Sequence, residues 1–179
     1  MHIITGTHKG NKICVPKGDV RPTMDKVREA IFAIIRSEVA HANVLDLFAG
    51  SGSLGLEALS EGAERCDFVE NSYKVIKILQ KNINNLTFEK YAHIHNCSVF
   101  SFLNNCATVY DLIFFDPPYK GEFACRIIKA IYMNNILCDE GIIVAETGKS
   151  EDLSEFENFI IKEKIYGETK VTILKKGFF

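Results

Sequence analysis

The 179-residue sequence lacks the features that mark several classes of protein. No apolar run approaches the roughly 20 residues that a helix needs to cross a lipid bilayer. Residues 1–6 do not combine a charged segment with an apolar stretch, so we expect no signal peptide. No repeat or low-complexity segment interrupts the chain. These absences favour a globular protein that works in the cytoplasm.

The sequence also lacks any CxxC pair, although it contains six cysteines. Scattered cysteines without an export signal predict reduced thiols in a cytosolic protein. His93 and His95 would share one face of a strand, which suits a metal ligand pair. No cysteine or carboxylate cluster lies near them in the sequence, so we expect no metal site.

An excess of basic charge is absent as well, because the net charge of the whole chain is −2. The charge is nevertheless uneven: residues 1–36 carry seven Lys or Arg and three Asp or Glu, a net charge of +4. A basic N-terminal segment on an acidic body could contact phosphates. A solvated surface with uneven charge explains the same pattern equally well.

The pattern of the chain changes after its N-terminal segment. Residues 2–7 and 12–15 read as two short strands around a turn at 9–11, which makes residues 1–20 a small β-hairpin arm. A helix should follow with Thr23 as its N-cap, and residues 21–179 should form one domain. From residue 43 onward, strands are expected at 43–47, 65–70, 92–96, 110–115 and 141–146, with helical patterns such as 72–86 between them.

Strands that alternate with helices predict a parallel α/β sheet covered on both faces. Segments 159–166 and 170–175 are joined by a link that is too short for a crossover, so they should form an antiparallel hairpin at the sheet edge. Ligands bind such sheets at the carboxyl ends of the strands. The groups expected there are Asp46 with its glycine-rich segment, Glu70-Asn71, Cys97-Ser98 and the segment from Asp116 to Tyr119.

The segment 50–55 matches GxGxxG, and Glu70 follows it at close to the separation expected of the ribose-binding acid in dinucleotide enzymes. An NAD site must therefore be considered. Asp46, however, would repel a pyrophosphate and attract an ammonium or sulfonium group. The glycines allow close approach of a ligand, and Glu70 could accept two ribose hydroxyls. A ligand with a cationic centre, an amino acid end and a nucleoside end fits these groups, and S-adenosylmethionine is such a ligand.

The segment Asp116-Pro117-Pro118-Tyr119 follows an apolar strand. The Asp116 carboxylate and the Pro117 carbonyl can accept the two hydrogens of a nucleobase amine and aim its lone pair at a methyl group. The prolines stiffen the segment, and Tyr119 offers a face on which a base can stack. The alternative is a turn with an incidental aspartate.

Together these stretches resemble a known family. "DLFAGSGSLGLEALSEGA" (46–63), "FVEN" (68–71) and "DPPY" (116–119) are similar to Rossmann-fold methyltransferases of exocyclic amines. "ITGTHKGNKICVPKG" followed by "RPTMDKVREAIF" narrows the resemblance to the RsmD family, which methylates a guanine N2 amine of bacterial 16S ribosomal RNA. It implies a Rossmann-like class I methyltransferase fold: a mostly parallel seven-stranded sheet with a C-terminal antiparallel hairpin and an N-terminal β-hairpin extension.

The resemblance also implies roles for individual residues. Asp46 and the glycines would hold the methionine end of S-adenosylmethionine, and Glu70 the ribose. Such enzymes usually place Asp or Asn where this chain has Ser98, so the Ser98 hydroxyl or the Val99 backbone would contact the adenine. The predicted cofactor-binding residues are Asp46, Phe48, Gly50, Gly52, Glu70, Asn71, Ser98 and Val99, and the predicted catalytic residues are Asp116, Pro117, Pro118 and Tyr119.

The expected partner is small-subunit ribosomal RNA, naked or within an assembling ribosomal particle, and the enzyme is expected to be a monomer that binds no membrane. Phosphate contacts are predicted for Lys9, Lys12, Arg21, Lys26 and Arg28. Deletion of residues 1–20 should therefore abolish RNA methylation and spare cofactor binding. The alternatives are an adenine-N6 methyltransferase acting on DNA or RNA, an NAD-dependent oxidoreductase, and an inactive RNA-binding or ribosome-assembly module.

Overall fold

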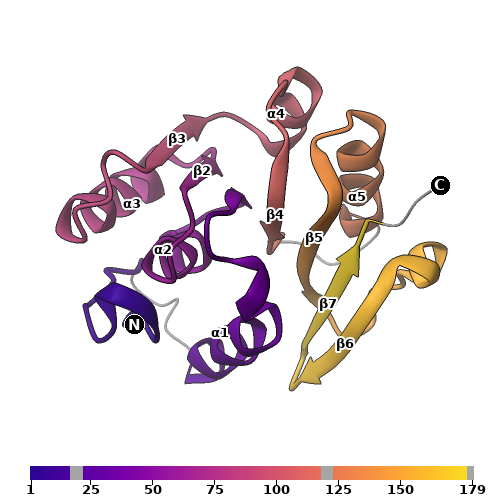
Figure 1. The fold of residues 1–179 in the computed structure, drawn as a ribbon, viewed down its shortest axis with the longest axis horizontal. Helices are drawn as coiled ribbons and strands as arrows, with labels where there is room; N and C mark the ends of the chain where they lie inside the picture. Colours follow the sequence, from indigo (N-terminus) through magenta and orange to yellow (C-terminus); the bar gives the residue numbers. More distant parts are fainter. Residues whose placement is uncertain (17–21, 118–122, 177–179) are drawn as a thin grey trace.

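The computed structural model describes residues 1–16, 22–117 and 123–176 of the chain. Its centre is one seven-stranded sheet with the strand order β3-β2-β1-β4-β5-β7-β6 (Figure 1). Neighbouring strands from β3 to β5 are parallel, and β7 runs antiparallel to both β5 and β6. The strands are β1 (Asn43–Leu47), β2 (Arg65–Glu70), β3 (Ala92–Asn96), β4 (Tyr110–Phe115), β5 (Leu137–Gly148), β6 (Ile160–Tyr166) and β7 (Thr169–Lys175).

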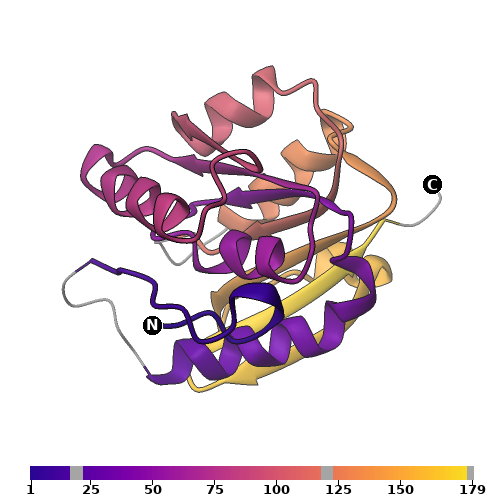
Figure 2. The same cartoon turned by 60° about the vertical axis from the view of Figure 1, so that its left-hand side comes forward.

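Helices cover both faces of the sheet (Figures 1 and 2). Side chains of α1, α2 and α3 pack in one apolar cluster with one face of the strands, and side chains of α4, α5 and η3 pack in a second cluster on the other face. The α-helices are α1 (Pro22–Ile35), α2 (Ser53–Ser60), α3 (Tyr73–Asn85), α4 (Val99–Asn105) and α5 (Phe123–Met133); the 3₁₀ helices are η1 (Gly6–His8), η2 (Arg36–Glu38) and η3 (Ser154–Phe159). None of the helices in the described ranges is long and apolar enough to span a bilayer.

The predicted architecture is confirmed, and four of the predicted strands, β1 to β4, have the predicted bounds. β5 is longer than the predicted 141–146 at both ends, because Leu137 pairs with β4 and Gly148 still pairs with β7. Helix α1 begins at Pro22, one residue before Thr23, which was expected to be its N-cap. Proline is favoured at the first helical position because its fixed φ suits the helix. A backbone N–H at this position would have no partner within the helix, so proline loses nothing by lacking one.

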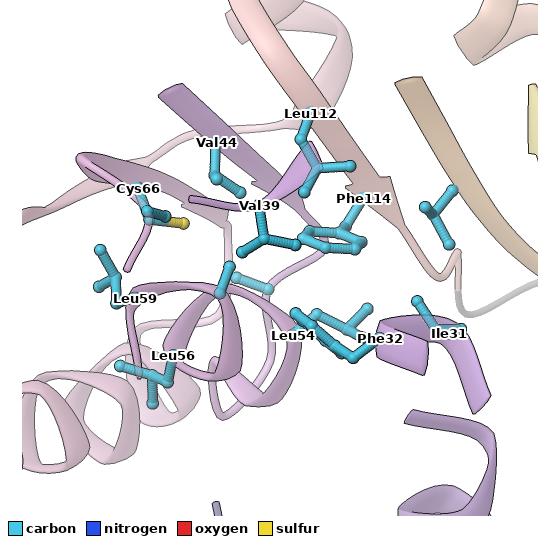
Figure 3. Close-up of a cluster of buried hydrophobic side chains, with 14 of the residues drawn as sticks. Ile31, Phe32, Val39, Val44, Leu54, Leu56, Leu59, Cys66, Leu112 and Phe114 are labelled. Atoms are coloured by element: carbon cyan, nitrogen blue, oxygen red, sulfur yellow. The ribbon is translucent and has the colours of Figure 1, made fainter. Parts of the chain in front are cut away.

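Side-chain alternation along the central strands explains the two cores. Phe114 of β4 faces α1, where its ring lies 5.7 Å from that of Phe32, and it packs in the cluster drawn in Figure 3. Its neighbours Ile113 and Phe115 point to the opposite face and pack in the second cluster. Because both faces are buried, most side chains of the central strands are apolar, and the acidic residues Asp46 and Glu70 lie near the carboxyl ends of β1 and β2.

The N-terminal segment is a hairpin with one antiparallel bridge, between His2 and Lys12. The predicted strands at 2–7 and 12–15 are not formed beyond this single bridge, and η1 occupies Gly6–His8, where Gly6 has a φ of 72°. Ile3 and Ile13 are each 1% exposed and belong to the core on the α1–α3 face. Figure 2 shows the segment lying against this face, so the hairpin is an integral part of the domain.

Candidate active site

A pocket of about 360 Å³ opens at the carboxyl ends of the parallel strands, near the point where the strand order reverses between β1 and β4. The fold brings to it five of the predicted cofactor-binding residues and the predicted catalytic Asp116. The lining residues are Phe48, Glu70, Asn71, Ser98, Val99, Phe100, Asp116 and Phe123. The segments that the sequence analysis placed on one rim therefore converge on one cavity.

Asp46 lies next to this pocket and is only 3% exposed. Its Oδ2 accepts a hydrogen bond from the Gly55 backbone N–H at 2.9 Å, so the carboxylate anchors the first turn of α2 to β1. The pKa of Asp46 is raised to about 8: burial is the main cause, this hydrogen bond opposes it, and the charges of Asp116 and Glu70 add to it. A cation bound nearby would offset the cost of ionising this carboxyl group.

Glu70 joins the glycine-rich loop to the end of β2. Its Oε2 accepts from Gly50 N at 3.1 Å, and its Oε1 accepts from Asn71 N at 2.9 Å and Ser72 N at 2.8 Å. A carboxylate has about four acceptor positions, so three are already used within the protein. Glu70 thus shapes the loop as well as facing the pocket, a role that the sequence analysis did not predict.

The backbone after β1 turns sharply into α2. Phe48 has a φ of 59°, a left-handed conformation that is uncommon for a residue with a side chain. Gly52 has a φ of 83°, and a Cβ at this position would lie 2.4 Å from Leu79 Cδ1 of α3. Gly52 is therefore required for the turn and for the close packing of the loop on α3.

Ser98 lies at the N-terminus of α4 and caps it, because its Oγ accepts from Ser101 N at 3.2 Å. Its hydroxyl oxygen already has a hydrogen-bond donor within the protein, and Val99 beside it is 5% exposed. Capping of α4 is therefore sufficient to explain why a serine occupies this position, without a contact to a ligand.

An aromatic wall on one side of the pocket was not predicted. Phe123 is 5.8 Å from Phe48 and 5.3 Å from Phe100 between ring centroids, and all three line the cavity. The guanidinium of Arg126 lies 4.8 Å from the Phe100 ring centre. Phe100 and Phe123 lie in the first turns of α4 and α5, directly after the loops that follow β3 and β4. Their position just beyond the carboxyl ends of these strands could have identified them as pocket residues from the sequence.

Asp116 follows the last residue of β4, which pairs with Leu47 of β1, and its side chain is exposed at the pocket. Pro117 is half-buried next to it. Pro118 and Tyr119, the other predicted catalytic residues, lie outside the described residues. A further carboxylate, Glu146 near the end of β5, was not predicted as a site residue, although it follows the pair that Ala145 forms with Phe115 of β4.

The predicted RNA contacts divide into two groups. Lys9, Lys12 and Lys26 are exposed, as a phosphate contact requires, and Arg21 lies outside the described residues. The predicted phosphate contact of Arg28 is wrong, because this residue is only 2% exposed. Its guanidinium donates to the His2 carbonyl at 2.6 Å and ion-pairs with Asp25 and Glu57, each at 3.1 Å, so it holds the N-terminal hairpin in place and cannot reach a phosphate.

Comparison with known proteins agrees with this geometry. The model of a protein family described as Conserved hypothetical protein 95 matches residues 1–175. The chain is 36% identical to the "Ribosomal RNA small subunit methyltransferase D" of Haemophilus influenzae, over 93% of this chain and 89% of that protein. The same name is carried by an Escherichia coli protein that is 36% identical over 82% of this chain and 74% of its own length.

A solved structure of the Escherichia coli protein yhhF superimposes with a TM-score of 0.90 and 33% identity, covering 98% of this chain and 97% of that one. The family match spans nearly the whole chain, and the relatives are similar over most of their own length, which establishes membership. The chain therefore belongs to the family described as Conserved hypothetical protein 95, the RsmD family that its sequence resembles.

Proposed function

We propose that this protein transfers a methyl group from S-adenosylmethionine to the exocyclic N2 amine of a guanine in small-subunit ribosomal RNA. The observation that carries the proposal is the pocket that joins the cofactor-type residues Phe48 and Glu70 to Asp116. Membership of a family whose relatives are named for methylation of small-subunit ribosomal RNA supports the substrate class.

The residues present fit S-adenosylmethionine. Its size suits a cavity of about 360 Å³, since small-molecule sites commonly measure about 300–1,000 Å³. The described lining combines aromatic rings with the carboxylates of Glu70 and Asp116, and it contains no Lys or Arg. When bound, S-adenosylmethionine supplies a methyl group that its sulfonium charge has already activated. Asp46 would stabilise the positive charge, the remaining acceptor position of Glu70 would accept a ribose hydroxyl, and the aromatic wall would exclude water.

Asp116 would bind the amine that receives the methyl group. Its carboxylate accepts one amine hydrogen and the Pro117 carbonyl accepts the other, which aims the nitrogen lone pair along the line of attack. The exposure of Asp116 leaves room for a base that enters from solvent. Lys9, Lys12 and Lys26 would contact the RNA backbone and set its position without reading its sequence.

Substitution of Asp116 tests the proposal. With radiolabelled S-adenosylmethionine and small-subunit particles, wild-type enzyme should label the RNA, while Asp116→Ala should transfer the methyl group at least about 100-fold more slowly. The affinity for S-adenosylmethionine, measured by titration calorimetry, should change little, because the Asp116 contact is to the acceptor base. Asp116→Asn, which keeps an acceptor oxygen, should lie between the two. Normal turnover by Asp116→Ala would contradict the assigned role.

A further inference from the structure

Glu146 occupies the strand position next to Asp116. β4 and β5 are parallel, and Phe115 of β4 pairs with Ala145 of β5, so Asp116 and Glu146 are the next residues along neighbouring strands. Strands in a sheet lie about 4.8 Å apart. Side chains alternate, and Val144 packs in the cluster on the α1–α3 face, which places Glu146 on that face together with Asp46 of β1.

The carboxylate of Glu146 has no ordinary structural partner. It is half-buried, and among residues 1–16, 22–117 and 123–176 no group forms a hydrogen bond or ion pair with it. Within the same ranges, Arg28 of α1 is the one cation whose charge lowers the pKa of Glu146. Arg28 already forms ion pairs with Asp25 and Glu57. A half-buried carboxylate without a hydrogen bond from the described residues leaves its acceptor positions open to solvent or to a ligand beside the site.

The surroundings of Glu146 favour its protonated form. Burial is the main cause that raises its pKa to about 8, followed by the charges of Asp116 and Asp46, and Arg28 opposes them. The residue that pairs with Glu146 on β7 is Val171, which carries no charge. A group that gains and loses its proton near neutral pH is suited to proton transfer.

We propose that Glu146 and Asp116 form a carboxylate pair that takes up the proton which the amine loses on methylation. This inference rests on the proposed function. The N–C bond forms as the C–S bond breaks, and the electron pair of the C–S bond stays on sulfur. The N–H bond then breaks with its electrons remaining on nitrogen, and the proton forms an O–H bond on Asp116, which shares it with Glu146 before release to solvent. Glu146 acts through Asp116 and is a positioning residue.

The test compares Glu146→Gln with Glu140→Gln, an exposed glutamate on the same strand that pairs with Lys175. Single-turnover methyl transfer is measured from pH 6 to pH 9 for both variants and for wild type. Glu146→Gln should transfer the methyl group at least 10-fold more slowly at pH 7.5. The acid limb of its pH profile should move to lower pH, because the carboxyl group that takes up a proton near pH 8 is absent from this variant.

Three further results decide the inference. Glu146→Asp should recover part of the rate and of the wild-type pH profile, and Glu140→Gln should match wild type. The affinity of Glu146→Gln for S-adenosylmethionine should remain within about 3-fold of the wild-type value, which separates proton transfer from loss of the cofactor site. A Glu146→Gln profile with the wild-type acid limb, whatever its rate, would overturn the inference. Absence of methyl transfer by wild-type enzyme would instead contradict the proposed function.

Discussion

At the scale of single residues, the site is built from carboxylates that serve the fold and the chemistry together. Asp46 anchors α2 through Gly55, and Glu70 holds the glycine-rich loop through Gly50. Their residue types and positions were predictable from the strand ends. Their backbone partners were not, because hydrogen bonds between segments separated in the sequence depend on how the loop turns in three dimensions.

The raised pKa of Asp46 predicts how the stability of the cofactor-free protein depends on pH. The pKa rises from a usual 3.8 to about 8 in the folded state, so the contribution of this group to stability is complete below about pH 4 and is lost as the pH rises toward 8. Asp46→Asn keeps an acceptor for Gly55 without the charge. Its melting temperature should therefore exceed that of wild type by several °C more at pH 8.5 than at pH 5, at roughly 2–4 °C per kcal/mol for this chain length, because most of the loss lies between these two pH values.

Asp139→Asn is a matched control for this measurement, since Asp139 is 82% exposed at its side chain and lies on β5. It should shift the melting temperature equally little at both pH values. An Asp46→Asn effect that does not change between pH 5 and pH 8.5 would show that burial of the carboxyl group does not govern its ionisation.

At the scale of elements, the N-terminal hairpin is part of the folded core, whereas its charge suggested only a basic arm that binds RNA. Glu57 of α2 is fully buried and accepts hydrogen bonds from Ile4 N at 2.9 Å and Thr5 N at 2.7 Å. Ile3 and Ile13 add core contacts worth about 1.5–3 kcal/mol each. Deletion of residues 1–20 should thus destabilise the whole domain and weaken cofactor binding, contrary to the expectation drawn from the sequence.

Asn82 of α3 connects the hairpin to the glycine-rich loop. It is fully buried, its Oδ1 accepts from Cys14 N at 2.8 Å, and its Nδ2 donates to the Cys14 carbonyl at 2.8 Å and to the Ser51 carbonyl at 2.9 Å. Asn82→Ala should lower the free energy of unfolding by about 1–3 kcal/mol, because buried backbone groups lose their partners. It should also weaken S-adenosylmethionine binding several-fold by loosening the loop at Ser51.

Chemical denaturation and titration calorimetry measure the two effects. Asn84→Ala, an exposed change on the same helix, is the control and should preserve both properties. Wild-type stability and affinity in Asn82→Ala would mean that the hairpin and the loop are independent of one another.

The predicted elements differ in how well the sequence determined them. Short, mostly apolar segments located β1, β2 and β4, which are buried on both faces, and a 3.6-residue pattern located α3, which is buried on one face. The hairpin was misjudged because its apolar residues Ile3 and Ile13 contact helices that are distant in the sequence. Arg28 was read as a surface charge for the same reason: the buried Glu57 that pairs with it belongs to α2, a separate element further along the chain.

At the scale of the whole molecule, the fold separates two kinds of surface. The carboxyl end of the sheet carries the acidic pocket, while the exposed lysines Lys9 and Lys12 lie on the N-terminal hairpin, which packs against α2. We propose that RNA contacts both surfaces, with its backbone at the lysines and one base in the pocket. A net charge of −2 predicts few phosphate contacts, so shape must contribute to recognition.

The most direct test of the central proposal is the chemical identity of the methylated nucleoside. Unmodified small-subunit ribosomal RNA, naked and within particles, is incubated with the enzyme and S-adenosylmethionine, digested to nucleosides and analysed by chromatography with mass spectrometry. We expect N2-methylguanosine, at about one per RNA molecule, in at least one of the two substrates. N6-methyladenosine in its place would contradict the guanine assignment, and the absence of any methylated nucleoside from both substrates would contradict the proposed function.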